Sequence, residues 1–209
     1  MRGSIALEGT AHLDSLYGVI ELSTVRASYS DVGIMLFITS GKLTRHSGEE
    51  IGQCQFDLYR RKRNRSWMDF EDIYYWMDVI SGSGQRMAQA LGEDGWIEAE
   101  YNFNTSALLV AERIHIEPSA RGQGAWKSLY FATMEKALKP LRRTPEEFFF
   151  KAFPLEFEGN VTKENEREFK AAERGLKLSY QVHLGAKALE VPADLGCYMR
   201  APVPEYLQR

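Results

Sequence analysis

The residues best suited to chemistry form a short glycine-containing turn, Arg-Gly-Gln-Gly-Ala-Trp at positions 121–126. The turn follows an apolar run over 108–116 and precedes a helical pattern over 127–138. The amides of a helix's first turn can bind an anion, and the helix dipole favours negative charge there. Two glycines let the backbone approach a ligand closely, and an arginine adds a cation. The turn therefore predicts a site for a phosphate or pyrophosphate group.

Composition and charge narrow the classes of protein to which the chain can belong. Its 209 residues, 44% of them apolar, suit one domain spanning residues 1–209. A net charge of -3 gives no bulk reason to expect nucleic acid or an anionic membrane as a partner. Cys54 and Cys197 are too few for a disulfide framework, and neither they nor the four scattered histidines have metal-ligand spacing. We expect a cytoplasmic protein with reduced cysteines, no metal and no membrane span or targeting signal.

The first half of the chain predicts strands followed by two helical segments. Residues 1–27 are either a partly flexible segment or hold an opening strand at 17–22. Two β-rich runs, at 33–39 and 52–59, predict an antiparallel pair. Apolar residues at helical spacing predict a helix over 70–80, which the run Ser81-Gly82-Ser83-Gly84 should break or kink before a second piece at 85–91. A further strand is expected at 96–101.

The second half predicts an alternation of strands and helices around the turn. The apolar run over 108–116 reads as a strand, and the continuous apolar character of 147–155 suits a central strand. A charged helix over 160–184 could be capped by Gly185, and a hairpin of 188–191 with 196–200 closes the chain. This order of elements is typical of an α+β fold with a mixed sheet.

The residues around the turn resemble the signature of the GNAT superfamily of acetyl-CoA-dependent N-acetyltransferases. The sequence Ile116-Glu117-Pro118-Ser119-Ala120-Arg121-Gly122-Gln123-Gly124 is similar to the strand end and glycine turn of that family. The segment from Phe150 to Phe157 looks like the fifth strand of a group of uncharacterised bacterial GNAT-like proteins, and 178–185 looks like the family's helix end. The resemblance implies a GNAT-like fold: a mixed central sheet of about six or seven strands flanked by about four helices.

The same resemblance implies acetyl-CoA as cosubstrate and a set of residues that would bind it. The backbone of Ile114, His115 and Ile116 would pair with the pantetheine arm. The amides of the turn would hold the pyrophosphate; these are Arg121, Gly122, Gln123, Gly124, Ala125 and Trp126.

The family's chemistry is direct attack of an amine on the thioester, which needs a base and an acid. Glu112, which strict alternation places on the strand face of Ile114 and Ile116, is the candidate base; the competing interpretation is a solvated or ion-paired carboxylate. Tyr180 is the candidate acid. The acceptor would be a small-molecule or protein amine, and a homodimer stays open.

Several residues support other interpretations. Trp126 stands where the family has Gly or Ala, and Gln181 stands where it has its catalytic tyrosine, so a GNAT-like binding or regulatory module without catalysis is the second hypothesis. The basic run at 60–65 reads as a solvated turn, with a nucleic-acid-associated acetyltransferase as a third hypothesis. The imidazole of His115 is expected to pack and to hydrogen-bond to backbone.

Overall fold

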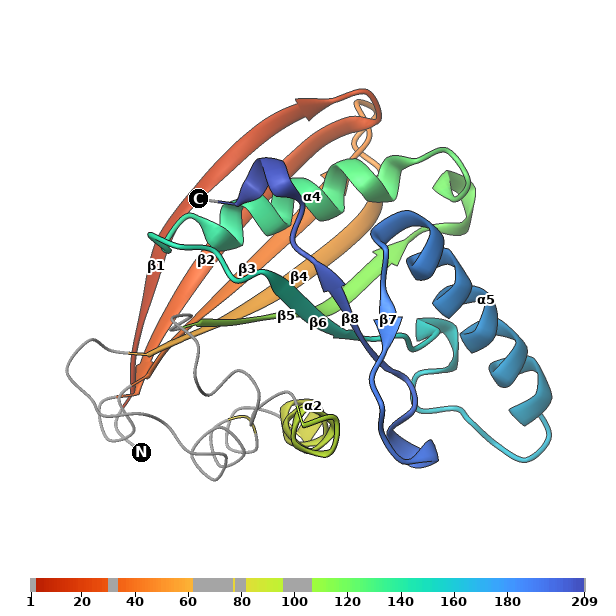
Figure 1. The fold of residues 1–209 in the computed structure, drawn as a ribbon. Helices are drawn as coiled ribbons and strands as arrows, with labels where there is room; N and C mark the ends of the chain where they lie inside the picture. The colour runs from red at the N-terminus through yellow and green to blue at the C-terminus, as the bar shows by residue number, and fades with distance from the viewer. Residues whose placement is uncertain (1–2, 30–33, 62–76, 78–81, 96–106, 209) are drawn as a thin grey trace. The chain divides into compact units, whose positions relative to one another are not determined.

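The computed structural model describes residues 3–29, 34–61, 77, 82–95 and 107–208. The chain divides into two compact units, which we treat separately. The first comprises residues 1–66, 105–146 and 203–209, and the second comprises 67–104 and 147–202. Across the described residues there are eight strands and three α-helices (Figure 1). The fold class is therefore α+β, as the sequence predicted.

The first unit is built on an antiparallel meander of five strands. Each strand pairs with the next along the chain. The strands are β1 (Gly3–Ser15), β2 (Gly18–Tyr29), β3 (Ile34–Thr44), β4 (Glu50–Arg61) and β5 (Ala107–Ile116).

One helix, α4 (Ala125–Leu138), lies across this meander (Figure 1). A Cβ atom at Gly41 of β3 would lie 2.1 Å from Oγ1 of Thr133, so the absence of a side chain allows the helix to approach the sheet closely. On β4, the ring of Phe56 meets that of Tyr130 edge-on, with centroids 4.9 Å apart. Because side chains alternate along a strand, the odd-numbered residues of β4 face away from α4. The sheet therefore has one face covered by α4 and a second face that carries Gln53, Gln55 and Asp57.

A β-bulge interrupts the pairing of β4 with β5. Gln55 pairs with Arg113, but Phe56 pairs with Ala111, which leaves Glu112 as the extra residue. A bulge re-aims side chains and ends strict alternation at its position. The face that alternation predicted for Glu112, shared with Ile114 and Ile116, therefore does not follow from the strand's periodicity.

The second unit contains helices α2 (Gly82–Glu93) and α5 (Glu166–Leu184) and three short strands. β8 (Tyr198–Pro202) is antiparallel to both β6 (Glu147–Lys151) and β7 (Lys187–Ala188). Three consecutive phenylalanines of β6, at 148–150, are all buried, as its apolar sequence predicted. Gly185 ends α5 in the left-handed region at φ 65°, and its amide donates to the carbonyl of Gln181.

Most predicted elements are present, with shifted ends. The antiparallel pair at 33–39 and 52–59, the strand at 108–116, the helix at 127–138 and the closing hairpin are confirmed. The N-terminal segment holds two long strands where one short strand or a flexible segment was expected. The strand at 147–155 ends at Lys151, and the helix over 160–184 begins only at Glu166.

The second helical piece predicted at 85–91 is present as α2, which begins at Gly82 and so includes three residues of the glycine-serine run; the expected break or kink before it lies outside the described residues. A helix N-terminus tolerates glycine better than a helix interior, since its first amides are not yet paired. The predicted helix over 70–80, apart from Met77, and the strand over 96–101 lie outside the described residues.

Candidate functional site

The glycine turn joins β5 to α4 in the first unit. After Ile116 the chain makes one 3₁₀ turn, Pro118–Ala120, and α4 then begins at Ala125. Gly122 and Gly124 have φ values of 76° and 85°, in a region that side-chain-bearing residues rarely adopt. A Cβ atom at Gly122 would meet no other atom within 4 Å, so open space adjoins the backbone there. The backbone thus takes the sharp path that the two glycines predicted.

The amides of this turn form the anion-binding feature. The Arg121 amide donates to the carbonyl of Pro118 at 3.3 Å, and that of Lys127 donates to Gly124 at 3.0 Å. Between them, the amides of Gly122, Gln123, Gly124 and Ala125 find no acceptor within the part of the chain that the structure describes. Consecutive unpaired amides at the positive end of a 14-residue helix can bind a phosphate oxygen.

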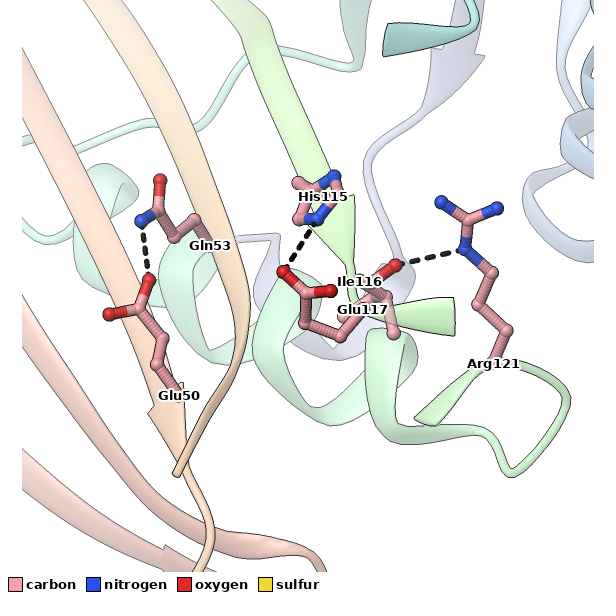
Figure 2. A network of polar contacts seen from close by, with 6 residues as sticks. All are labelled: Glu50, Gln53, His115, Ile116, Glu117 and Arg121. Atoms are coloured by element: carbon pink, nitrogen blue, oxygen red, sulfur yellow. Dashed lines mark hydrogen bonds and ion pairs between the residues drawn. The ribbon is translucent and has the colours of Figure 1, made fainter. Parts of the chain in front are cut away.

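Two side chains hold the turn from outside it. The hydroxyl of Tyr17, in the β1–β2 hairpin, donates to the carbonyl of Gln123 at 2.6 Å. Nε of Arg121 donates to the carbonyl of Ile116 at 2.9 Å, which fixes the guanidinium across the base of the turn (Figure 2). Sequence reasoning missed Tyr17, because 106 positions separate it from Gln123 and no local pattern marks it.

Trp126 packs along the helix. Its half-buried ring meets that of Tyr130, one helical turn further on, edge-on with centroids 6.0 Å apart. The ammonium of Lys127 lies 5.8 Å from the centre of the indole ring. The indole therefore has neighbours within α4, and this packing accounts for a bulky residue in the first helical turn.

The end of β5 carries the residues predicted to pair with a pantetheine arm. Ile114, His115 and Ile116 pair along one edge with Cys54, Gln53 and Gly52 of β4. The imidazole of His115 contacts the carboxylate of Glu117 at 3.2 Å (Figure 2), so the expectation of a backbone partner for this side chain was wrong.

A second polar contact near His115 involves β4. Gln53 donates to the carboxylate of Glu50 (Figure 2), which also forms an ion pair of 2.5 Å with Lys42 of β3. The hydrogen bond from Lys42 holds the pKa of Glu50 below its usual range, and the Gln53 amide adds to this. The same pairing raises the pKa of Lys42.

Asp57, which interacts electrostatically with Glu112, was not predicted from the sequence. It lies on β4 and is only 5% exposed. Nε2 of Gln55 donates to Oδ1 of Asp57 at 2.9 Å. Burial, followed by the charge of Glu112, raises the pKa of Asp57 to about 7, although the Gln55 amide favours the ionised form. In the sequence Asp57 reads as one more polar residue of an alternating strand, and nothing local signals its burial.

A polar groove of about 390 Å³ opens in the first unit. Its walls come from four strands, β2 to β5. The residues that line it include Glu21, Ser23, Ser40, Lys42, Gln53, Gln55 and Arg113. It thus includes both members of the Gln55–Arg113 pair, which adjoins the bulge at Glu112.

Tyr180, the predicted acid, belongs to the second unit. It lies on α5, is 9% exposed, and its ring meets that of Phe150 edge-on with centroids 4.9 Å apart. Its carbonyl accepts a hydrogen bond from Ala186 beyond the helix end. Glu112 lies in the first unit, so the pairing of these two residues in one reaction stays a prediction.

The remaining candidates have structural roles or none. Burial raises the pKa of the thiols of Cys54 and Cys197, as expected of packed cysteines. Arg60 of the basic run donates to the carbonyl of Pro140 at 2.6 Å and lies over the ring of Phe37; positions 62–65 are outside the described residues.

The described residues contain neither a cluster of metal ligands nor a membrane-spanning helix. No three His, Cys, Asp or Glu side chains in the described ranges gather to hold a metal ion. Of the helices in those ranges, none is long and apolar enough to cross a membrane.

Comparison with known proteins gives a weak structural likeness. No protein-family profile matches the sequence, and no curated protein does either. Among solved structures, the chain is similar to arylalkylamine N-acetyltransferase 2 from Aedes aegypti, with 13% identity and a TM-score of 0.43 over 79% of this chain and 73% of that one. A likeness at this level assigns neither a family nor an activity to this chain.

Proposed function

We propose that the protein is a GNAT-like N-acyltransferase that transfers an acetyl or related acyl group from acyl-CoA to an amine. The observation that carries the proposal is the glycine turn, where four consecutive amides at the start of a long helix have no acceptor among the described residues. The family resemblance of residues 116–124 gives that anion site a specific occupant, the pyrophosphate of CoA.

The residues of the first unit suit such a ligand. The Gly122 and Gly124 backbone would hold the pyrophosphate, and Arg121, anchored at Ile116, supplies a positive charge beside it. The backbone of residues 114–116 would pair with the pantetheine arm. Bound in this way, acyl-CoA supplies the activated thioester carbonyl.

The reaction moves two protons besides the acyl group. The proposed base, Glu112, accepts a proton from the ammonium, so that the neutral amine nitrogen can bond to the acyl carbon as the carbon–sulfur bond breaks. The proposed acid, Tyr180, gives a proton to the leaving thiolate and recovers one as the new amide loses its second proton.

Calorimetric titration with acetyl-CoA tests the site, with Gly122→Ala as the informative variant. Alanine at φ 76° is strained and adds a methyl group where the pyrophosphate would lie, so we expect the Kd to rise about tenfold or more, the equivalent of about 1.4 kcal/mol.

Gly159→Ala is the matched control for this titration. Gly159 has the same φ of 76° and the same open surroundings, but lies in the second unit. The control variant should bind acetyl-CoA as the wild type does. Equal affinities for the wild type and both variants, or no binding at millimolar acetyl-CoA, would refute the proposed cofactor site.

The burial of Tyr180 against Phe150 favours a second candidate, a GNAT-like module that binds acyl-CoA without turnover. A tyrosine packed in this way is well placed for stability, and catalysis needs it to reach a thiolate. The two candidates separate when acetyl-CoA binds: release of free CoA with any primary amine supports the enzyme, and binding without release across a broad amine panel supports the module.

A further inference from the structure

The polar groove of the first unit lies on the sheet face opposite α4. Gln53 and Gln55 alternate with Cys54 and Phe56 on β4, and Phe56 contacts the helix, so the two glutamines face the other way. Ser40 pairs with Gln55 in the neighbouring strand β3 and shares its face. The groove is thus separated by one sheet layer from the helix that begins at the glycine turn.

Exposure falls along the face of β4 that carries the groove. Gln53 is exposed, Gln55 is half-buried, and Asp57, two residues further on the same face, is 5% exposed. The hydrogen bond of 2.9 Å from Gln55 to Asp57 links the groove wall directly to the buried carboxyl group. Glu112 at the bulge is close enough to act electrostatically on Asp57. Neither carboxyl group lines the groove itself, but each adjoins a residue that does: Asp57 through its hydrogen bond with Gln55, and Glu112 as the chain neighbour of Arg113.

Polar and charged side chains make up most of the lining of the groove, and Gly41 and Cys54 complete it. It offers the hydroxyls of Ser23 and Ser40 and the amides of two glutamines, and no aromatic side chain is among the described residues that line it. The charge of Lys42, at the exposed end, is balanced by its ion pair with Glu50. A volume of about 390 Å³ lies near the lower limit of the roughly 300–1,000 Å³ of small-molecule sites. These features suit a compact ligand with many hydrogen-bonding groups.

We propose that this groove is the acceptor site and that it takes a compact primary amine bearing hydroxyl or amide groups, with the ammonium directed to Asp57 and Glu112. The inference rests on the proposed acyltransferase function. The hydroxyls and amides of the wall would replace the hydrogen bonds that water makes with the hydroxyl or amide groups of such an amine. An aromatic amine has no such groups on its ring and would leave the wall unpaired.

The carboxyl pair supplies the first chemical step. One nitrogen–hydrogen bond of the ammonium breaks and one oxygen–hydrogen bond forms on a carboxylate, which leaves a neutral nucleophilic nitrogen. A buried carboxyl group with a pKa of about 7 is about half protonated at neutral pH, so the two groups together would carry between one and two negative charges for the ammonium.

The closing experiment measures direct binding as well as turnover. Glucosamine serves as the polar probe and phenethylamine as the aromatic one, each titrated with and without acetyl-CoA, while free CoA release reports acylation. We expect saturable binding of glucosamine and a kcat/KM at least about tenfold higher for it than for phenethylamine.

Ser23→Leu should fill the groove and raise the glucosamine Kd or KM about tenfold, while the Kd of acetyl-CoA stays unchanged. Ser28→Leu is the matched control, since Ser28 is also a half-buried serine of β2 but lies on the opposite face by alternation. If Ser23→Leu does not fold, as judged by its thermal midpoint, Ser40→Leu at an exposed position of the groove replaces it.

Each outcome bears on one proposal. Failure of acetyl-CoA to bind would overturn the acyltransferase, whatever glucosamine does. Absence of saturable glucosamine binding, equal binding by Ser23→Leu, or a preference for phenethylamine would overturn the acceptor groove, even if acetyl-CoA binds tightly.

Discussion

The glycine turn and the Asp57–Glu112 pair, both in the first unit, provide charge in opposite ways. The turn presents backbone amides to solvent at the start of α4, and its positive potential depends on φ angles at Gly122 and Gly124. The pair presents side-chain carboxyl groups, one of them buried, and its potential depends on proton occupancy. The first should respond to changes in backbone geometry and the second to pH, so the two can be perturbed separately.

The largest expected effect is the pH dependence that Asp57 imposes on stability. Its pKa is about 7 in the fold against an ordinary 3.8, so the folded state binds more protons between these values and stability falls as pH rises through them. Between pH 5 and 8 the loss should be about 3 kcal/mol. Urea unfolding at both pH values should show this loss in the wild type and much less of it in Asp57→Asn.

Asp14→Asn, at an exposed position of β1, is the control and should keep the wild-type pH dependence. If the unfolding free energy of the wild type does not fall over this range, the pKa of Asp57 is not raised in the folded protein, and the carboxyl pair does not respond to pH in this way.

Glu112→Gln should lower kcat about 100-fold, because it removes the proposed proton acceptor. The Kd of acetyl-CoA should be unchanged, since the amides of the turn are untouched. Steady-state kinetics and calorimetry measure the two quantities. The same change at Glu117, whose carboxylate contacts His115 just beyond β5, should leave kcat near the wild-type value. A Glu112 variant that loses acetyl-CoA affinity would show that the two sites are not separable.

Tyr17→Phe is expected to have the smallest effect and acts on the turn alone. It removes the hydrogen bond of 2.6 Å to the Gln123 carbonyl, whose loss costs about 0.5–1.5 kcal/mol and should raise the Kd of acetyl-CoA roughly two- to tenfold. Tyr206→Phe, at a residue that is 71% exposed, is the control for loss of a tyrosine hydroxyl. A change in the acceptor KM, with the acetyl-CoA Kd unaltered, would contradict the assignment of Tyr17 to the turn.

The turn could be predicted because the residues that form it are consecutive in the sequence. Glycines at 122 and 124, after an apolar strand and before a helix, specify left-handed backbone and unpaired amides locally. Strands β3 to β5 and helix α4 were predictable for the same reason, since periodicity is a local property.

The carboxyl pair could not be predicted, because it arises from pairing between distant strands. Asp57 approaches Glu112 only through the register of β4 with β5, and the bulge that breaks alternation at Glu112 leaves no sign in the sequence. The same holds for Tyr17, which reaches Gln123 from another hairpin. The single-domain organisation and the roles of Glu112 and Tyr180 stay predictions.

The close seating of α4 on the sheet also sets the position of its first turn. At Gly41 and Gly52 a hydrogen atom stands where a methyl group would collide with Thr133 or Ile116. The same two strands, β3 and β4, carry the groove on their other face. The absence of side chains at these two positions therefore determines how closely α4, and with it the anion site, lies to the sheet that carries the groove.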